Sequence, residues 1–349
     1  MNFIMAIDQG GTKTDIIIAD KHGNIRGYGN DRELLASGEI DSYPVYYKKD
    51  RRIVRMLRVR YAAERALENA SLKFNDIVKV SASCTGADWE YEYELGIKNL
   101  RKTLGIEDVS LYNDCIGALR GGTEIMGRDT AVLCLGTGAN CALINREGDV
   151  LIYAYYVKNI HQGASAIGSF VFDAVYDAEA GLEPKTLLTQ LLLEETGYAS
   201  VDDLYMHISA GSNEEGEQWE PAYKDYCHLL FKAVKAGDSV AVNYLEKFCQ
   251  GLARYILLGA KKLAMQEREI CLVLSGGVPK SGSLIVDLLK ENLEKDLKGI
   301  SCIQASFEPV VGALLLDYDK VYSGNIPMDI RSRLEKNCKV RNLLRSVLE

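Results

Sequence analysis

Two stretches of the chain, Phe3 to Ile25 and Thr130 to Val150, share one order of apolar and polar positions. Each begins with an apolar run, turns at a segment rich in Gly and Thr, and continues with a second apolar run. Each then turns again at a glycine, Gly23 or Gly148, before a third extended piece. The apolar runs are short and rich in Ile, Val and Leu, which is typical of buried strands. The pattern therefore predicts a duplicated unit, a β-hairpin with a third strand, that opens each of two related domains.

The rest of the chain alternates between helical and extended patterns. Apolar residues near helical spacing and short apolar runs predict helices at 51–70, 91–104, 115–121, 164–180, 184–196, 220–236, 239–265, 283–297 and from 311, and strands at 77–84, 109–113, 270–274 and 300–304. Residues 326–349 are expected to form a basic terminal helix that docks on the body. This alternation predicts an α/β fold with mixed sheets. With six prolines and no Ser/Gly-rich linker, the halves are expected to join closely around a cleft.

Composition and charge narrow the class of protein. The 349 residues are 47% hydrophobic and 26% charged, and the net charge of −8 argues against nucleic acid or an anionic membrane surface as a partner. No apolar run approaches the roughly 18 residues of a membrane span. Asp8 interrupts the first apolar stretch too early for a signal peptide. Nine scattered cysteines without a CxxC pair, and four histidines, indicate reduced thiols rather than a zinc site. We expect a cytoplasmic protein.

The two Gly/Thr turns carry the first candidate chemistry. Glycine lets another group approach the backbone closely, and clustered N–H groups and hydroxyls form a nest for an anion. A pair of such turns on facing domains would hold a polyphosphate between them, whereas one alone is as well explained as an ordinary hairpin turn. The residues are Gly10, Gly11, Thr12, Lys13 and Thr14 in the first turn, and Gly136, Thr137 and Gly138 in the second.

Three further positions add to this picture. Asp8 ends the first strand, where a buried carboxylate beside a phosphate site predicts Mg²⁺ binding through water. A third turn at Gly276 and Gly277 ends a strand and precedes a helix, where its backbone would face a flat nucleoside. Asp114 follows the strand 109–113 and opens a short helix. It is either an N-cap or a general base for a hydroxyl that attacks phosphorus, and both roles can coexist.

Other motifs are absent or ambiguous. The sequence has no Gly-Lys dipeptide, hence no Walker A loop, and no HExxH motif. The basic run from Lys48 to Arg60 holds seven positive residues and one acid. Its charges lie off the apolar stripe, which favours a solvated helix face over a contact with anions or nucleic acid. Trp89 and Trp219 lie in acidic segments that we expect to be surface loops.

Four motifs stand in the order found in the sugar kinase/Hsp70/actin superfamily: DQGGTKTD at 8–15, YNDCIGAL at 112–119, CLGTGANCALI at 134–144 and LSGGV at 274–278. More narrowly, the chain resembles the BadF/BadG/BcrA/BcrD ATPase family, which includes N-acetylglucosamine kinases, over roughly residues 1–320. The resemblance implies two ribonuclease H-like domains of the actin-like ATPase fold around an interdomain nucleotide cleft. Their expected extents are 1–120, completed by a C-terminal helix at about 313–349, and 121–312 with helical insertions.

The resemblance also implies ATP and Mg²⁺ as cofactors and assigns roles to residues. Phosphate binding is assigned to the first two turns, adenosine binding to Gly276 and Gly277, and Mg²⁺ to Asp8. Asp114 takes the place of the catalytic base toward the 6-hydroxyl of a sugar. The sugar is expected near Thr85, Gly86, Asp88, Asn113 and Asn140.

Two departures from the kinases leave the substrate open. The Gly-Asp-Glu-Gly-Ser segment of the kinases has its best counterpart in residues 165–169, where Ala166 and Ile167 replace the acidic pair. The kinases also have an Asn in the loop after the third strand, and this chain has none there. The loss of such ligands changes the substrate of a sugar pocket. The leading hypothesis is ATP-dependent phosphotransfer to a hydroxyl of an amino sugar, by a homodimer with no nucleic-acid or membrane partner.

Two alternatives remain. The first is an ATPase that activates a partner resembling the 2-hydroxyacyl-CoA dehydratases, with an iron–sulfur cluster held by paired cysteines. Cys134 and Cys141, which flank the second turn, are the one close pair that the sequence offers for it. The second alternative is a nucleotide-dependent binding module without turnover. Sugar-dependent ADP release separates both from the kinase.

Overall fold

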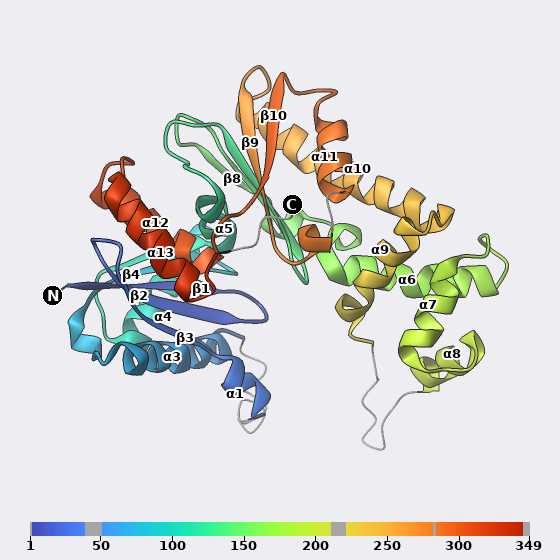
Figure 1. The fold of residues 1–349 in the computed structure, drawn as a ribbon, viewed down its shortest axis with the longest axis horizontal. Helices are drawn as coiled ribbons and strands as arrows, with labels where there is room; N and C mark the ends of the chain where they lie inside the picture. Colours follow the sequence, from blue (N-terminus) through green and yellow to red (C-terminus); the bar gives the residue numbers. More distant parts are fainter. Residues whose placement is uncertain (1, 39–50, 211–220, 282–283, 345–349) are drawn as a thin grey trace.

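Two mixed β-sheets form the centres of two lobes (Figure 1). The computed structural model describes residues 2–38, 51–210, 221–281 and 284–344. The first sheet has the strand order β3-β2-β1-β4-β5 and the second the order β10-β9-β6-β7-β8. The strands are β1 (Phe3–Gln9), β2 (Thr14–Asp20), β3 (Ile25–Asn30), β4 (Ile77–Cys84), β5 (Val109–Asn113), β6 (Thr130–Leu135), β7 (Ala139–Ile144), β8 (Val150–Ile152), β9 (Glu269–Ser275) and β10 (Gly299–Gln304).

The duplicated unit predicted from the apolar pattern is confirmed. Strands β1 to β3 form an antiparallel meander in one sheet, and β6 to β8 form the same meander in the other. Each sheet adds parallel strands on the other side of the meander's first strand. Because side chains alternate across a strand, β1 sends Met5 and Ile7 into one core and Ile4 and Ala6 into another. Both faces of the strand are buried, which explains its continuous apolar run.

Helices cover both faces of each sheet. On the first sheet α3 (Arg51–Ala70) and α4 (Glu90–Leu104) pack against one face, and α12 (Pro309–Val321) and α13 (Met328–Val340) against the other. Helix α5 (Asp114–Gly122) packs against the inner face of the second sheet. The outer face of that sheet is covered by α6 (Gly163–Glu179), α7 (Leu187–Thr196), α8 (Val201–Ala210), α9 (Cys227–Lys235), α10 (Ser239–Lys262) and α11 (Leu284–Leu293). Because α12 and α13 complete the first lobe, we propose domain limits near residues 120 and 312.

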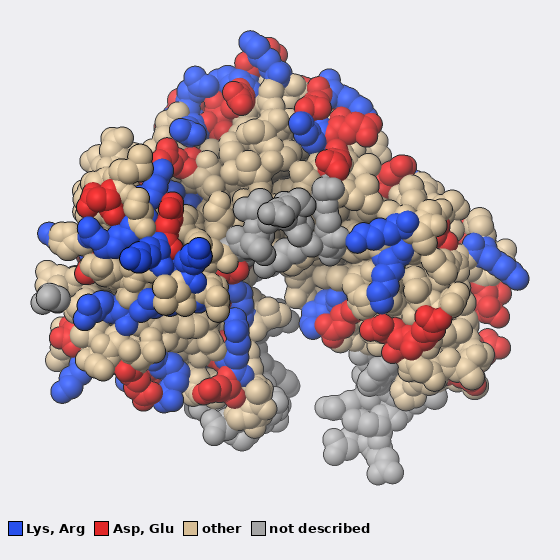
Figure 2. Space-filling view, in the orientation of Figure 1, with Lys and Arg blue, Asp and Glu red and all other residues tan. Residues whose placement is uncertain are grey.

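The two lobes meet along α5 and α12, which pack closely at glycines. A Cβ on Gly312 would lie 1.8 Å from the carbonyl oxygen of Gly117, so the backbone excludes any larger residue there. Away from this junction the lobes separate, and the space-filling view shows open space between them (Figure 2). The predicted cleft between the halves is therefore present.

The structure differs from the predicted elements in a few places. The helix predicted at 220–236 is a 3₁₀ turn (Tyr223–Tyr226) followed by α9. The terminal helix predicted over 326–349 ends as α13 at Val340, shortly before Asn342, whose φ is 54°. The last residues, 345–349, lie outside the described part. Helices α1 (Arg32–Ala36) and α8 were not predicted. Among residues 201–209 of α8, Val201 and Leu204 are the buried ones, which leaves too faint a helical period to detect.

Two surface expectations can also be compared with the structure. Trp89 is 46% exposed and is the N-cap residue of α4, at the end of the predicted surface loop. Trp219 lies outside the described residues. Among the helices of the described part, none combines the length and the apolar character needed to cross a membrane.

Candidate active site

The first glycine turn, between β1 and β2, is closed by its own backbone. The amide of Gly10 donates to the carbonyl oxygen of Lys13 at 2.9 Å. Gly11 and Thr12 are exposed, whereas Thr14 is buried, and its hydroxyl has no hydrogen-bond partner among the described residues. The turn thus presents exposed backbone next to an unpartnered hydroxyl, as a phosphate nest requires.

A buried ion pair supports this turn from behind. Arg58 of α3 donates Nε to Asp31 at 2.5 Å and Nη1 to the carbonyl oxygen of Gly11 at 3.0 Å. Asp31 in turn accepts the amide of Thr14 at 2.9 Å. Arg58 and Asp31 are both buried, so solvent screens their attraction little. The interpretation of the basic run as a solvated helix face is therefore wrong for Arg58, because a distant aspartate provides a buried partner that the sequence does not reveal.

Lys13 is paired with carboxylates around the turn. Its Nζ lies 2.7 Å from Asp15 and 3.6 Å from Glu308. Burial alone would lower the pKa of Lys13, but the carboxylates of Asp15, Asp8 and Glu308 hold it above its usual value. Lys13 is thus charged at neutral pH, and its ammonium group is paired with the neighbouring carboxylates.

The second and third turns touch each other. In the β6–β7 turn the amide of Gly136 donates to the carbonyl oxygen of Gly138 at 3.0 Å, and Thr137 and Gly138 are exposed. Gly276, directly after β9, has a φ of 109°, and a Cβ there would lie 2.1 Å from the carbonyl oxygen of Leu135. Both the positive φ and the close contact with Leu135 therefore require glycine at position 276. Two of the three predicted turns therefore form one surface.

The start of α6 packs against this surface. Two amides of its first turn donate to carbonyl oxygens of the β6–β7 turn at 2.9 and 3.0 Å. Residues 165–169 lie inside α6, where Ile167 is fully buried in the core. The segment that reaches the β6–β7 turn from outside the helix is 159–162, in which Gln162 accepts an amide of β7 at 2.9 Å. The predicted counterpart of the kinases' acidic segment, 165–169, thus lies within α6, and the segment 159–162 before the helix holds no carboxylate either.

Asp114 lies at the start of α5, where the lobes meet. The N-cap is Asn113, whose Oδ1 accepts the amide of Cys115 at 3.0 Å, so the alternative interpretation of Asp114 as a cap is wrong. Oδ1 of Asp114 is buried and has no hydrogen-bond partner among the described residues. Asn140, in β7 of the other lobe, contributes a side-chain hydrogen bond to the carboxylate. One carboxylate oxygen is thus available to accept a proton.

The surroundings of Asp114 make it a stronger base than an exposed aspartate. Its pKa is raised to about 6, chiefly by burial and also by the negative charge of Asp88. The amide of Cys115, the charge of Arg55 and the side chain of Asn140 act in the opposite direction. A pKa slightly below neutral pH suits a general base, which must be ionised and still attract a proton.

The β4–α4 loop holds Asp88 next to the start of α5. Nδ2 of Asn113 donates to Oδ1 of Asp88 at 2.7 Å and to the carbonyl oxygen of Ala87 at 3.2 Å. Because the amide of Asn113 is engaged on both sides, this residue positions Asp88 as well as capping α5. Burial raises the pKa of Asp88, as does the charge of Glu92. The structure thus brings Asp88, Asn113, Asp114 and Asn140 together.

One protein family has these segments in this order. The model of the BadF/BadG/BcrA/BcrD ATPase family matches residues 6–316, a span that contains all three turns, Asp88 and Asp114. The chain belongs to the BadF/BadG/BcrA/BcrD ATPase family. The resemblance inferred from the four motifs is therefore confirmed.

Relatives of this BadF/BadG/BcrA/BcrD family member include enzymes and solved structures. The N-acetyl-D-glucosamine kinase of Dictyostelium discoideum is 26% identical over 327 residues, which cover 89% of this chain and 96% of the relative. A Chromobacterium violaceum structure, provisionally named as an N-acetylglucosamine kinase, matches with a TM-score of 0.64 at 17% identity, covering 90% of this chain and 98% of that one. The ROK hexokinase of Thermus thermophilus matches with a TM-score of 0.56 at 14% identity, covering 92% and 99%. The fold is thus the actin-like ATPase fold of the sugar kinases, as expected.

Sequence reasoning missed Arg55 as a site residue. It lies on α3 in the basic run, and its Nη1 donates to the carbonyl oxygen of Thr85 at 3.2 Å. Gly86 has a φ of 73°, and a Cβ there would lie 2.7 Å from the same nitrogen. The solvated-face interpretation is wrong here too. The signal available was the position of Arg55 one helical turn before Arg58, on the same side of the helix.

Asp8 fits a magnesium site of the kind found in this family's reaction class. Mg²⁺ binds few protein carboxylates and keeps several waters, so one aspartate beside phosphates is sufficient. Asp8 is buried and pairs in register with Asp15, whose carboxylate already accepts from Lys13 and from Tyr28 at 2.7 Å each. Among the described residues no group of three or more His, Cys, Asp or Glu could hold a metal by itself.

The cysteines of this family member bear on the iron–sulfur alternative. In the β6–β7 register Cys141 lies opposite Leu133 and Cys134 opposite Asn140, so the two thiols point to opposite faces of the sheet. Cys134 instead packs against the core that holds the buried Cys115 of α5, whose pKa is raised by burial and by this neighbouring thiol. Cys134 and Cys141, the one close pair in sequence for the iron–sulfur alternative, therefore do not converge on a common site, because strand alternation directs them to opposite faces.

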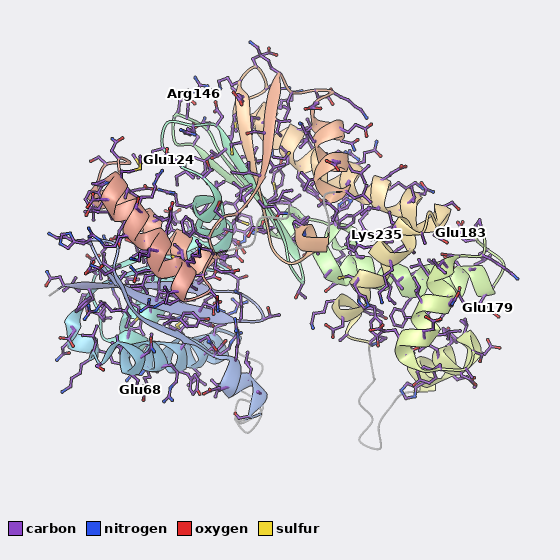
Figure 3. All side chains as sticks on the ribbon, viewed as in Figure 1. Glu68, Glu124, Arg146, Glu179, Glu183 and Lys235 are labelled. Atoms are coloured by element: carbon purple, nitrogen blue, oxygen red, sulfur yellow. The ribbon has the colours of Figure 1, made fainter. Side chains whose placement is uncertain are left out.

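The charged side chains labelled in Figure 3 are not part of the site. Glu124 and Arg146 lie on the side where the lobes join, away from the open space between them, and Glu68 lies on the outside of the first lobe (Figure 3).

Proposed function

We propose that the protein transfers the terminal phosphoryl group of ATP to a hydroxyl of an amino sugar such as N-acetylglucosamine. The observation that carries this proposal is the buried Oδ1 of Asp114, without a partner among the described residues, at the junction of the lobes and beside Asp88. The family membership and the activity of the Dictyostelium relative support the same reaction class.

In this proposal the nucleotide binds between the lobes. The phosphates lie against two turns, of which the β1–β2 turn offers the unpartnered Thr14 hydroxyl, and the adenosine lies against Gly276 and Gly277. Asp8 holds Mg²⁺ through water, and the ion neutralises charge on the transferred phosphate. Lys13, within the first turn, adds a positive charge near the phosphates.

The residues of this chain then act on the acceptor. Asp88, Thr85, Gly86 and Asn140 orient the sugar, and Asn113 fixes Asp88 through its 2.7 Å hydrogen bond. Asp114 accepts the proton of the attacking hydroxyl as the oxygen approaches phosphorus. Most of the rate acceleration comes from positioning and charge, and closure of the lobes excludes water that would otherwise hydrolyse ATP.

The test is ADP release with Mg-ATP in the absence of an acceptor and with N-acetylglucosamine, glucosamine, N-acetylmuramic acid or glucose. We expect release that depends on an amino sugar and disappears in Asp114→Asn. Hydrolysis that does not depend on any acceptor would contradict the proposal and favour the ATPase activator. Tight ATP binding without ADP release would favour a binding module.

We also propose a cytoplasmic homodimer. All nine cysteines are free, and Cys84, Cys115, Cys141, Cys249 and Cys338 are buried, as suits a reducing compartment. Light scattering of the purified chain tests the dimer, and fractionation of cells tests the location.

A further inference from the structure

A pocket of about 330 Å³ opens beside the Thr85–Gly86 turn and extends between α3 and α4. At about 30 Å³ per water in the liquid, this volume corresponds to roughly eleven water molecules, so it has room for several heavy atoms of a ligand. Polar groups at the β-strand ends and aliphatic side chains from both helices line it, including Gln9, Thr85, Arg55, Met56, Leu95 and Leu100. Thr85 and Gly86 are already assigned to the sugar, but the part of the pocket between the two helices has no role so far.

The pocket lies on the opposite face of the first sheet from the magnesium residue. In the β1–β4 register Gln9 pairs with Cys84, and both line the pocket, whereas Asp8 is one position earlier and points to the other face. Cys84 pairs in turn with Asn113, whose side chain holds Asp88 on the pocket's side. The pocket is therefore continuous with the proposed sugar-binding loop rather than with the phosphate turns.

Arg55 is the cation among the pocket's described lining residues, and most of its N–H donors are available to a ligand. A guanidinium carries five N–H groups, of which one bonds the Thr85 carbonyl at 3.2 Å. Glu92, the nearby acid in the lining, is engaged elsewhere: one oxygen accepts the amides of Asp88 and Trp89 at 2.9 and 3.0 Å. A cation and aliphatic walls in one pocket match an oxygen acceptor followed by a short alkyl chain.

We propose that this pocket binds the N-acyl substituent of the acceptor sugar, with its carbonyl oxygen at Arg55 and its alkyl chain between Met56 and Leu95. The inference rests on the proposed kinase function and deepens it. It makes the enzyme one that accepts acyl chains longer than acetyl, because the space in the pocket exceeds what a single methyl group fills. Arg55 is then a substrate-binding residue, and Leu95 sets the permitted chain length.

The experiment compares N-acetyl-, N-propionyl- and N-butyrylglucosamine as acceptors for the wild type and for pocket-filling variants. Leu95→Trp and Asn99→Phe place bulk in the pocket from two half-buried positions on α4, and Lys98→Trp is the matched control on the exposed side of that helix. Thermal melts of all variants check that they fold.

We expect the wild type to use the N-butyryl acceptor with a kcat/KM within about threefold of that for the N-acetyl one. Each pocket-filling variant should lower kcat/KM for the N-butyryl acceptor roughly tenfold or more, since a methylene that loses its pocket costs about 10-fold or more. The same variants should lower kcat/KM for the N-acetyl acceptor by a clearly smaller factor and leave the KM for ATP nearly unchanged, and Lys98→Trp should change none of these values.

Two results would overturn the inference and leave the kinase standing. In the first, the wild type phosphorylates N-acetylglucosamine but not its N-butyryl analogue. In the second, the pocket-filling variants lose kcat/KM by the same factor with both acceptors. If no acylated amino sugar is phosphorylated, and titration calorimetry detects no binding of N-butyrylglucosamine either, then the kinase and the pocket assignment both fail.

Discussion

Replacement of Asp114 by asparagine tests the proposed base through activity and stability together. Folding raises the pKa of Asp114 from its ordinary 3.8 to about 6, so the folded protein binds this proton more tightly than the unfolded chain. Stability therefore falls as the pH rises from about 4 to 6, and the full cost persists above pH 6. At about 1.4 kcal/mol per pH unit this cost is about 3 kcal/mol, an upper value because the residue is only partly buried.

An asparagine side chain is neutral at every pH, so the Asp114→Asn variant should be more stable than the wild type above pH 6 and equally stable near pH 4. For 349 residues the unfolding entropy is about 0.7 kcal/mol per kelvin, so the gain in Tm is at most about 4 °C. The wild type should also lose kcat/KM below pH 6, as the base becomes protonated.

The assays are scanning calorimetry from pH 4 to pH 8.5 and coupled ADP release with N-acetylglucosamine. Glu94→Gln, an exposed carboxylate on α4, is the control for the loss of a charge. A variant that turns over normally would refute Asp114 as the base. A Tm difference that does not change with pH would refute the raised pKa, even if activity is lost.

Other substitutions test the remaining parts of the site. Arg55→Met should move the acidic limb of kcat/KM to higher pH, because the charge of Arg55 lowers the pKa of Asp114, and a pH–rate profile checks this shift. Asp8→Asn should raise the Mg²⁺ concentration needed for half-maximal ADP release at fixed ATP. We expect a rise of roughly 10- to 100-fold, because the loss of a residue that contacts a metal indirectly typically weakens metal binding by that factor. Gly276→Ala should cost at least about 1–3 kcal/mol of stability and weaken ATP binding, since its φ is 109° and a Cβ would meet the carbonyl oxygen of Leu135. Gly277→Ala, with open space for a Cβ in the protein itself, should leave the stability unchanged, as melts will show.

The duplicated hairpins were predictable because their information is local. Apolar runs of a strand's length and glycines at the turns specify strand, turn and strand without reference to distant residues. The same is true of α3, which was predicted with its observed bounds, Arg51 to Ala70. Asp114 was found because it stands directly after a predicted strand, at an end where side chains converge.

What the sequence did not reveal depends on contacts between distant segments. Arg58 was expected in solvent because its charge lies off the apolar stripe, but its partner Asp31 is 27 positions away. Asn113 was expected beside the sugar, and its capping bond to Cys115 could be recognised only once the helix start was known. The proximity of Cys115 to Cys134 likewise requires that α5 be packed against β6. Local pattern cannot report such pairs, since each partner alone looks like a surface or core residue.

The link between Asp114 and Asn140 makes the strength of the base depend on how the lobes meet. Oδ1 of Asn140 accepts the amides of Cys141 and Ala154, both at 2.8 Å, so its amide nitrogen is the group left to face Asp114. The side chain is therefore fixed within its own lobe, and its hydrogen bond to Asp114 is set by the position of the lobe rather than by a rotamer. That bond lowers the pKa of Asp114. If the lobes separate, this bond is lost, but water also reaches Asp114 and removes the burial that is the largest cause of its raised pKa, so the pKa falls toward its ordinary value and Asp114 becomes a weaker base. Proton transfer is thus favoured only while the lobes are joined around their substrates.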